Sequence, residues 1–172
     1  MRELILLRHA KSGWDDPKLD DFDRPLAPRG REAAPLIGQA MAARGWVPDA
    51  VLVSAALRTR QTWRLVAGEL GQGMPEAERN KGLYMAPAGR ILSFINNVPE
   101  EAQRVLVIGH NPGIGDLALL LCTPESDAAA LRRMGGKFPT AALAHFEVAQ
   151  KWSELEVRSA RLTEFLRPKD IS

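Results

Sequence analysis

Short apolar runs bounded by polar residues recur along the chain and predict buried strands. These runs cover residues 3–8, 50–53 and 104–109. The interior positions of these runs are all Leu, Ile or Val, which is typical of parallel strands that are covered on both faces. Residues 75–84 are less regular and predict one short strand at most.

Between these runs, apolar residues recur at helical spacing and predict helices over residues 30–44, 57–70 and 89–97. Gly45 and Gly71 are expected to end the first two helices, because glycine readily adopts the conformation that follows a helix. Asn111 and Pro112 predict the start of a further helix over residues 113–121, with Asn111 as its cap and Pro112 at its first position.

The last third of the chain has a different pattern. Residues 141–148 and 155–162 alternate apolar and polar positions, as exposed or edge strands do, and Gly135, Gly136 and Pro139 indicate loops. Strands that alternate with helices predict an α/β domain. We expect a three-layer α/β/α fold with a mostly parallel central sheet and an antiparallel edge.

Composition narrows the classes of protein. The chain has 172 residues, the size of one domain, with 45% hydrophobic and 26% charged residues. It contains no apolar stretch of about 20 residues that would span a membrane. The apolar run near the N-terminus is too short for a signal peptide, so we expect a cytoplasmic protein with no membrane partner.

The cysteine, histidine and charge content restricts the ligands. A single cysteine, Cys122, forms no internal disulfide, and with three histidines it does not match the spacing of a structural zinc site. We expect neither a metal nor another cofactor. The net charge is +2 without a basic run of five or six residues, which disfavours nucleic-acid binding. The excess of Arg over Lys indicates an oxyanion ligand.

Candidate catalytic residues lie where predicted strands end. Arg8 and His9 end the first strand, His110 follows the strand over residues 104–109, and Arg58 lies in the first turn of a helix after another strand. In an open α/β sheet, ligands bind at this edge. A neutral imidazole can attack phosphorus, and an adjacent Arg attracts phosphate while it repels metal ions.

Phosphoryl transfer requires a nucleophile in line with the leaving group and fixed cations or donors around three oxygens. Arg8, His9, Arg58 and His110 supply these groups, so the sequence predicts a covalent phosphohistidine on His9. Each residue taken alone also fits a plainer role, such as a solvated arginine or a histidine near a helix cap. Ser12 either donates a hydrogen bond to phosphate or is simply a polar loop residue.

The motifs Leu7-Arg8-His9-Ala10, residues 54–62 with Arg58, and Gly109-His110-Asn111-Pro112 resemble those of the histidine phosphatase superfamily. The short chain, together with Asp23-Arg24-Pro25-Leu26, is similar to the SixA-like phosphohistidine phosphatases. The resemblance implies a phosphoglycerate mutase-like fold and one histidine phosphatase domain over residues 1–172. It also implies that His9 is the nucleophile, that Arg8 and Arg58 clamp the phosphate, and that His110 stabilises the transferring group.

One departure from the wider superfamily bears on the substrate. Phosphoglycerate mutases and many acid phosphatases of this superfamily carry a carboxylate proton donor after the third strand, whereas residues 81–85 contain none. An alkyl phosphate needs such a donor because its leaving group is an alkoxide. Imidazole leaves more readily, which favours phosphohistidine in a partner such as a phosphotransfer domain. The chain also shows no long insertion that would close a lid over the site.

Two other functions remain open at this stage: a small-molecule phosphomonoesterase of the same superfamily, and a non-catalytic module that binds phosphorylated ligands. A monomer is the default expectation.

The aspartates of residues 15–23 predict a solvated loop in which Asp23 pairs with an arginine. We expect His145 at the surface or in satisfied packing, and Trp14 at the pocket entrance.

Overall fold

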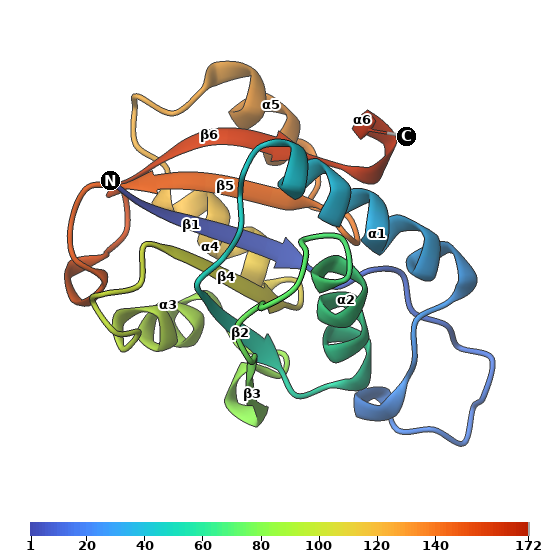
Figure 1. Ribbon diagram of the computed structural model, residues 1–172. Coiled ribbons are helices and arrows are strands. Elements are labelled where there is room, and N and C mark those ends of the chain that lie inside the picture. The colour runs from blue at the N-terminus through green and yellow to red at the C-terminus, as the bar shows by residue number, and fades with distance from the viewer. Residues whose placement is uncertain (172) are drawn as a thin grey trace.

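The computed structural model describes residues 1–171 and contains one six-stranded sheet with the strand order β3-β2-β4-β1-β5-β6 (Figure 1). The strands are β1 (Arg2–Arg8), β2 (Ala50–Ser54), β3 (Glu78–Asn80), β4 (Arg104–Gly109), β5 (Leu143–Val148) and β6 (Ala160–Leu166). β1 to β4 run parallel to one another. β5 is antiparallel to both β1 and β6.

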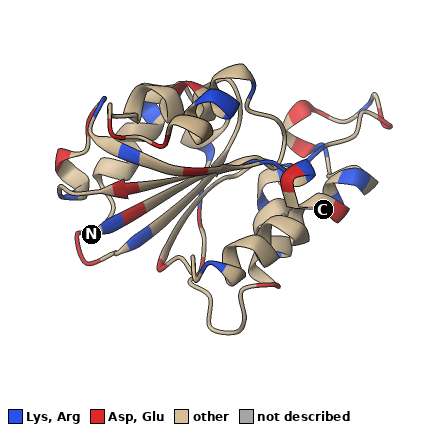
Figure 2. Ribbon diagram, turned by 90° about the horizontal axis from the view of Figure 1, so that it is seen from above, with Lys and Arg blue, Asp and Glu red and all other residues tan. Residues whose placement is uncertain are grey.

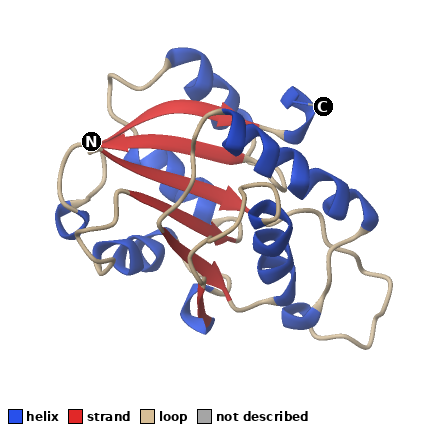
Figure 3. Cartoon of the chain, in the orientation of Figure 1, coloured by secondary structure: helices blue, strands red, loops and turns tan. Residues whose placement is uncertain are grey.

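Helices connect these strands and cover both faces of the sheet (Figure 3). They are α1 (Pro28–Ala43), α2 (Leu57–Ala67), α3 (Ala88–Asn96), α4 (Gly113–Leu121), α5 (Ala128–Gly136) and α6 (Pro168–Ile171). Three short 3-10 helices are η1 (Asp21–Asp23), η2 (Lys81–Leu83) and η3 (Trp152–Glu154). Within residues 1–171, none of the helices combines the length and apolar character needed to cross a membrane.

The sheet separates two apolar cores, and alternation along β1 shows how. Leu4 and Leu6 face the core that α3, α4 and α5 cover, whereas Ile5 and Leu7 face the core beneath α1 and α2. All four side chains are fully buried, and each contributes roughly 1.5–3 kcal/mol to folding. Figure 2 shows the helices on the two faces of the twisted sheet, with acidic and basic residues interspersed. The predicted α/β fold class is confirmed.

The strand predicted over residues 155–162 is misplaced, because the structure has β6 at Ala160–Leu166. Trp152 and Leu155 are apolar for another reason. Both are buried in the core at and after η3, and the Trp152 indole donates a hydrogen bond to the Ala102 carbonyl at 2.7 Å. The apparent alternation over residues 155–162 therefore began with a residue, Leu155, that anchors a turn. β5 is also not an edge strand, since β1 and β6 flank it.

Two helix predictions also need correction. α5 was not predicted; Gly135 and Gly136 lie at its end instead of in a loop, and Asp127 caps its start by accepting a hydrogen bond from the Ala130 amide at 2.9 Å. α2 ends at Ala67, before the Gly71 that was expected to follow it. The cap of α2 is Gly68, the earlier glycine in the same segment.

His145 on β5 lies in satisfied packing instead of at the surface. Its imidazole stacks on the Trp46 ring with centroids 4.2 Å apart, and its Nε2 lies 2.7 Å from a carboxylate oxygen of Glu3. Its Nδ1 contacts the hydroxyl of Thr163 at 2.5 Å. All the polar atoms of this imidazole are thus used within the fold, on residues remote from the candidate site.

Candidate active site

A cavity of about 260 Å³ opens where β1 and β4 end. Its wall contains every residue that the sequence predicted for the site: Arg8, His9, Ser12, Arg58 and His110. The parallel pairing of β1 with β4 brings the two histidines together, because Arg8 pairs with Gly109 in the sheet register. The two imidazole centroids lie 5.3 Å apart.

His9 is buried and held in one orientation. Its amide donates a hydrogen bond to the Gly109 carbonyl at 3.1 Å, and its Nδ1 lies 2.7 Å from the Ala10 carbonyl oxygen. A carbonyl oxygen only accepts, so Nδ1 carries the hydrogen and Nε2 keeps a free lone pair. The Ala10 amide in turn donates to the Thr62 hydroxyl on α2 at 3.0 Å, which fixes the loop. This is the arrangement that a nucleophilic histidine requires.

His110 has the opposite tautomer. The Arg58 guanidinium lies 3.3 Å from its Nδ1, and a guanidinium only donates, so Nδ1 is the acceptor. Its Nε2 therefore carries the hydrogen and donates to the Ser54 hydroxyl at 2.7 Å. Ser54 ends β2, which places this contact beneath the cavity. Both ring nitrogens of His110 are thus engaged within the protein, which fixes the imidazole beside the Arg58 cation.

Arg58 is almost fully buried and is anchored by Asp21 of η1. It donates to the Asp21 backbone carbonyl at 2.6 Å and to the Asp21 carboxylate at 2.9 Å. The Tyr84 hydroxyl donates to the same carboxylate oxygen, and Arg24 donates to the other at 3.0 Å. Asp21, not the predicted Asp23, therefore pairs with arginine, because η1 directs it toward α2 while Asp23 stays exposed.

The charges around Asp21 keep it ionised. Burial acts to raise the pKa of this carboxyl, but hydrogen bonds from Tyr84 and Arg58 outweigh burial and hold the pKa at about 2. At neutral pH Asp21 is therefore a carboxylate. It positions two arginines and carries no proton to give to a leaving group.

Arg8 and Arg24 complete the basic wall. Arg8 donates to the Phe138 carbonyl at 3.1 Å, and burial together with the nearby Arg58 lowers its pKa below the usual value of arginine. Arg24 is buried with its guanidinium 3.4 Å from the centroid of the Trp14 ring. The Trp14 side chain is itself largely exposed at the rim, in accord with its predicted place at the entrance.

Several lining residues were not predicted from the sequence: Lys11, Asp21, Arg24, Met85, Asn111 and Thr140. Asn111 was expected to cap α4, and its side-chain oxygen does accept a hydrogen bond from the Gly115 amide at 3.1 Å. α4 has the predicted bounds, Gly113–Leu121, but the residue in the cap position is Pro112 instead of Asn111. The remaining residues lie in loops or, for Asp21, in the short helix η1, where periodicity gives no signal of which side chain points inward.

Two glycines allow helices to approach the cavity loops closely. A methyl group at Gly30 on α1 would lie 2.1 Å from the Lys11 carbonyl oxygen, and one at Gly113 on α4 would lie 1.9 Å from the Ala86 carbonyl oxygen. Both distances are far inside van der Waals contact. Glycine is therefore required at these positions for the backbones to meet.

Both site histidines are neutral at physiological pH. Burial, followed by the charges of the neighbouring arginines, lowers the pKa of His9 from 6.5 to about 4. Burial, the charge of His9 and that of Arg58 lower the pKa of His110 to about 3. A bound phosphoryl dianion acts in the opposite direction, because a nearby negative charge favours the protonated imidazole.

These values predict that neither ring titrates between pH 5 and 8 in the phosphate-free protein. Unfolded histidines have a pKa near 6.5, so between about pH 4 and 6.5 the unfolded chain binds more protons than the folded chain. The free energy of unfolding should therefore fall as the pH drops through this window. Ring ¹⁵N chemical shifts followed in a phosphate-free buffer measure the titration directly.

The same protein in denaturant is the control for this titration, since all of its imidazoles should then titrate near pH 6.5. A midpoint at or above pH 6.5 for His9 in the folded protein would contradict the electrostatic description of the cavity. Chemical denaturation at several pH values supplies the matching stability curve.

The chain is similar to known proteins in both sequence and structure. Residues 4–85 match the model of the histidine phosphatase superfamily (branch 1). An uncharacterized protein of Mycobacterium tuberculosis is 40% identical over 164 residues, which span 95% of this chain and 100% of the relative.

Two solved structures are similar over nearly the whole chain. A protein from Nakamurella multipartitia assigned as the phosphohistidine phosphatase SixA has a TM-score of 0.83 with 30% identity, covering 97% of this chain and 96% of its own. One from Agrobacterium tumefaciens, assigned in the same way, has a TM-score of 0.79 with 30% identity, covering 97% and 98%.

Proposed function

The chain belongs to the histidine phosphatase superfamily, in its SixA-like branch, and from this membership we propose that it hydrolyses phosphohistidine in a signalling or phosphotransfer protein. The reaction proceeds through a covalent phosphohistidine on His9. Arg8 and Arg58 hold the phosphoryl oxygens, His110 stabilises the transferring group, and the Ser12 hydroxyl is available to donate a hydrogen bond to it.

The first step breaks the N–P bond of the substrate. The free Nε2 of His9 attacks phosphorus, and the departing imidazole of the substrate takes a proton from solvent. In the second step water attacks the phosphorus of phospho-His9, which releases inorganic phosphate and returns neutral His9. Fixed guanidinium groups stabilise the negative charge that is spread over three phosphoryl oxygens in each transition state.

The observation that carries this proposal is the donor set of the cavity. Within the described part of the chain, its wall contains three arginines and two neutral histidines but one carboxylate, Asp21, which stays ionised. Glu76 and Glu78 do not line it. A phosphoramidate can be cleaved in a cavity with these residues because imidazole is a good leaving group. An alkyl phosphate instead requires a strong acid beside its alkoxide leaving group.

We also propose that the reaction needs no metal ion. Arg8, Arg24 and Arg58 place three positive charges around the phosphoryl position, which is the electrostatic task that divalent cations perform in other phosphatases. The rate should then be the same before and after treatment with EDTA. The cytoplasmic location, the monomeric state and the absence of nucleic-acid and membrane partners stay predictions.

The test compares leaving groups in one experiment. We expect kcat/KM for a phosphohistidine peptide to exceed that for an alkyl phosphate such as glycerol phosphate by at least about 10²-fold, the usual contribution of a general acid. An aryl phosphate, whose phenolate leaves without full protonation, should lie between them. Release of inorganic phosphate under identical conditions measures all three.

Equal or faster turnover of the alkyl phosphate would instead identify a small-molecule phosphomonoesterase. Tight binding of phosphate without turnover of any of the three would identify a binding module. A catalytically inert preparation is recognised separately, because a folded enzyme should still show the neutral histidine rings in its NMR spectrum.

A further inference from the structure

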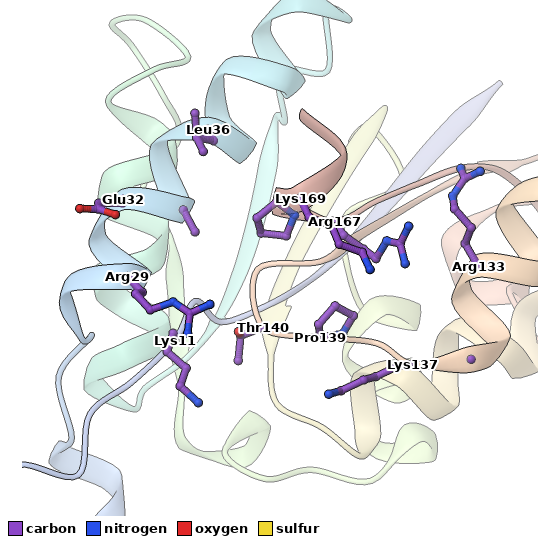
Figure 4. Close-up of a pocket in the computed structure, with 13 residues that line it drawn as sticks. Lys11, Arg29, Glu32, Leu36, Arg133, Lys137, Pro139, Thr140, Arg167 and Lys169 are labelled. Atoms are coloured by element: carbon purple, nitrogen blue, oxygen red, sulfur yellow. The ribbon is translucent and has the colours of Figure 1, made fainter. Parts of the chain in front are cut away.

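A second and larger hollow, of about 730 Å³, adjoins the catalytic cavity (Figure 4). We call it the basic groove. It runs between the start of α1, the loop after α5 and the segment from β6 to α6, and Lys11 and Thr140 belong to its wall and to that of the cavity. A chain that leaves the catalytic cavity on this side would therefore enter the groove.

The groove wall has a strong excess of positive charge. Six basic side chains line it against a single acidic one, Glu32: Lys11, Arg29, Arg133, Lys137, Arg167 and Lys169. Arg167 is paired with Asp170 at 2.9 Å, and Arg133 donates to the Phe165 carbonyl at 3.2 Å. The other four are exposed and, among residues 1–171, have no carboxylate within ion-pair distance.

The four free cations do not converge on one point. Figure 4 shows Lys11 and Arg29 on one side of the groove and Lys137 on the other, with Pro139 and Thr140 between them. A compact anion such as phosphate would need several donors at one position. Separated charges with uncharged residues between them suit an extended partner that carries several carboxylates.

We propose that the basic groove binds an acidic segment of the phosphoprotein substrate, adjacent in sequence or in space to its phosphohistidine. This inference rests on the proposed function, because it takes phosphohistidine as the substrate residue that enters the catalytic cavity and meets His9. The cations raise the local concentration of an acidic partner and orient it, while the catalytic cavity performs the reaction. The groove is thus a determinant of which phosphoprotein is selected.

An acidic protein segment fits the groove better than a nucleic acid does. Tight binding to the backbone of a nucleic acid commonly uses roughly 6–10 phosphate contacts along a continuous track of basic residues. The groove offers four cations that have no ion-pair partner among residues 1–171, and the chain as a whole has a net charge of only +2. A nucleic acid is therefore the competing occupant in the test.

The binding test uses two double variants with the same change in net charge. Arg29→Glu/Lys137→Glu reverses two groove charges outside the catalytic cavity, and Arg132→Glu/Lys151→Glu reverses two exposed charges elsewhere. The probe is a fluorescent, unphosphorylated peptide rich in Asp and Glu, followed by anisotropy. We expect the groove variant to bind it at least about tenfold more weakly than wild type, and the control variant to bind it as wild type does.

Equal binding by wild type and the groove variant would overturn the proposal. So would a single-stranded oligonucleotide of matched charge that binds wild type more tightly than the peptide and depends on the same two residues. Because this probe carries no phosphoryl group, the result does not depend on phosphohistidine turnover.

A kinetic arm then separates the groove from the proposed activity. Wild type should show a KM at least about tenfold lower for a phosphohistidine peptide with flanking aspartates than for one with flanking serines, and the groove variant should lose this preference. Hydrolysis of an aryl phosphate should be the same in all three proteins. If neither peptide is hydrolysed while the aryl phosphate is, the proposed function fails, and the anisotropy result alone decides the groove. A wild type without preference between the peptides contradicts the groove.

Discussion

Replacing His9 with alanine should lower kcat on a phosphohistidine peptide by at least about 10⁴-fold, since loss of a covalent nucleophile costs this much or more. The residual arginines still bind phosphate but have nothing to transfer it to. The phosphorylated enzyme should disappear as well. Mass spectrometry after an alkaline quench, which preserves phosphohistidine, measures the covalent species alongside the rate.

His145→Gln is the matched control for this variant, because it removes another buried imidazole that lies outside the cavity. It should lose stability, through the contacts to Glu3 and Thr163, but retain the phosphoenzyme and most of the rate. If His9→Ala were to keep its rate within tenfold of wild type, His9 would not be the nucleophile.

The second large effect is expected at Arg58. Arg58→Ala should reduce kcat/KM by roughly 10³-fold, in the range measured for arginines and donors that stabilise phosphoryl or oxyanion transition states. The side chain contacts both the Asp21 carboxylate and the Nδ1 of His110, so its removal takes one cation from the phosphoryl position and one of the two hydrogen bonds from the His110 ring. Steady-state kinetics on phosphohistidine peptide and aryl phosphate measure the loss.

Two further variants help to interpret the loss of kcat/KM in Arg58→Ala. Arg58→Lys should recover only part of the rate, because one ammonium cannot reproduce the forked donation to Asp21 and His110. Arg60→Ala, on the same helix but outside the cavity wall, should leave the rate unchanged. An Arg58→Ala enzyme with unchanged kcat/KM and an intact fold would remove this residue from the phosphate site.

The sequence predicted the part of the fold that depends on continuous apolar runs. β4 was predicted with its observed bounds, since six consecutive residues that are mostly apolar leave no other placement. The segment after Pro139 was predicted less well. There Leu155 is buried by a turn and not by a strand, and a run of alternating residues does not distinguish these two cases.

The residues of the candidate site also fall into those that the sequence could predict and those that it could not. Arg8 ends β1, and His9 and His110 directly follow β1 and β4. Parallel pairing brings the ends of these strands to one edge, so the proximity of the three residues could be predicted without coordinates. Asp21 and Arg24 belong to a loop with several similar aspartates. Which aspartate turns inward depends on the path of η1 against α2, a tertiary contact that no local pattern encodes.

The close approach at Gly30 and Gly113 constrains any redesign of this enzyme for bulkier substrates. Met85 and Thr140 contribute side chains to the wall and can be exchanged to change its shape. The positions of the loops behind them are set by main chain lying directly on main chain, with no room for even a methyl group. A library that varies the wall while holding these two glycines constant should therefore keep far more folded members than one that samples all positions equally.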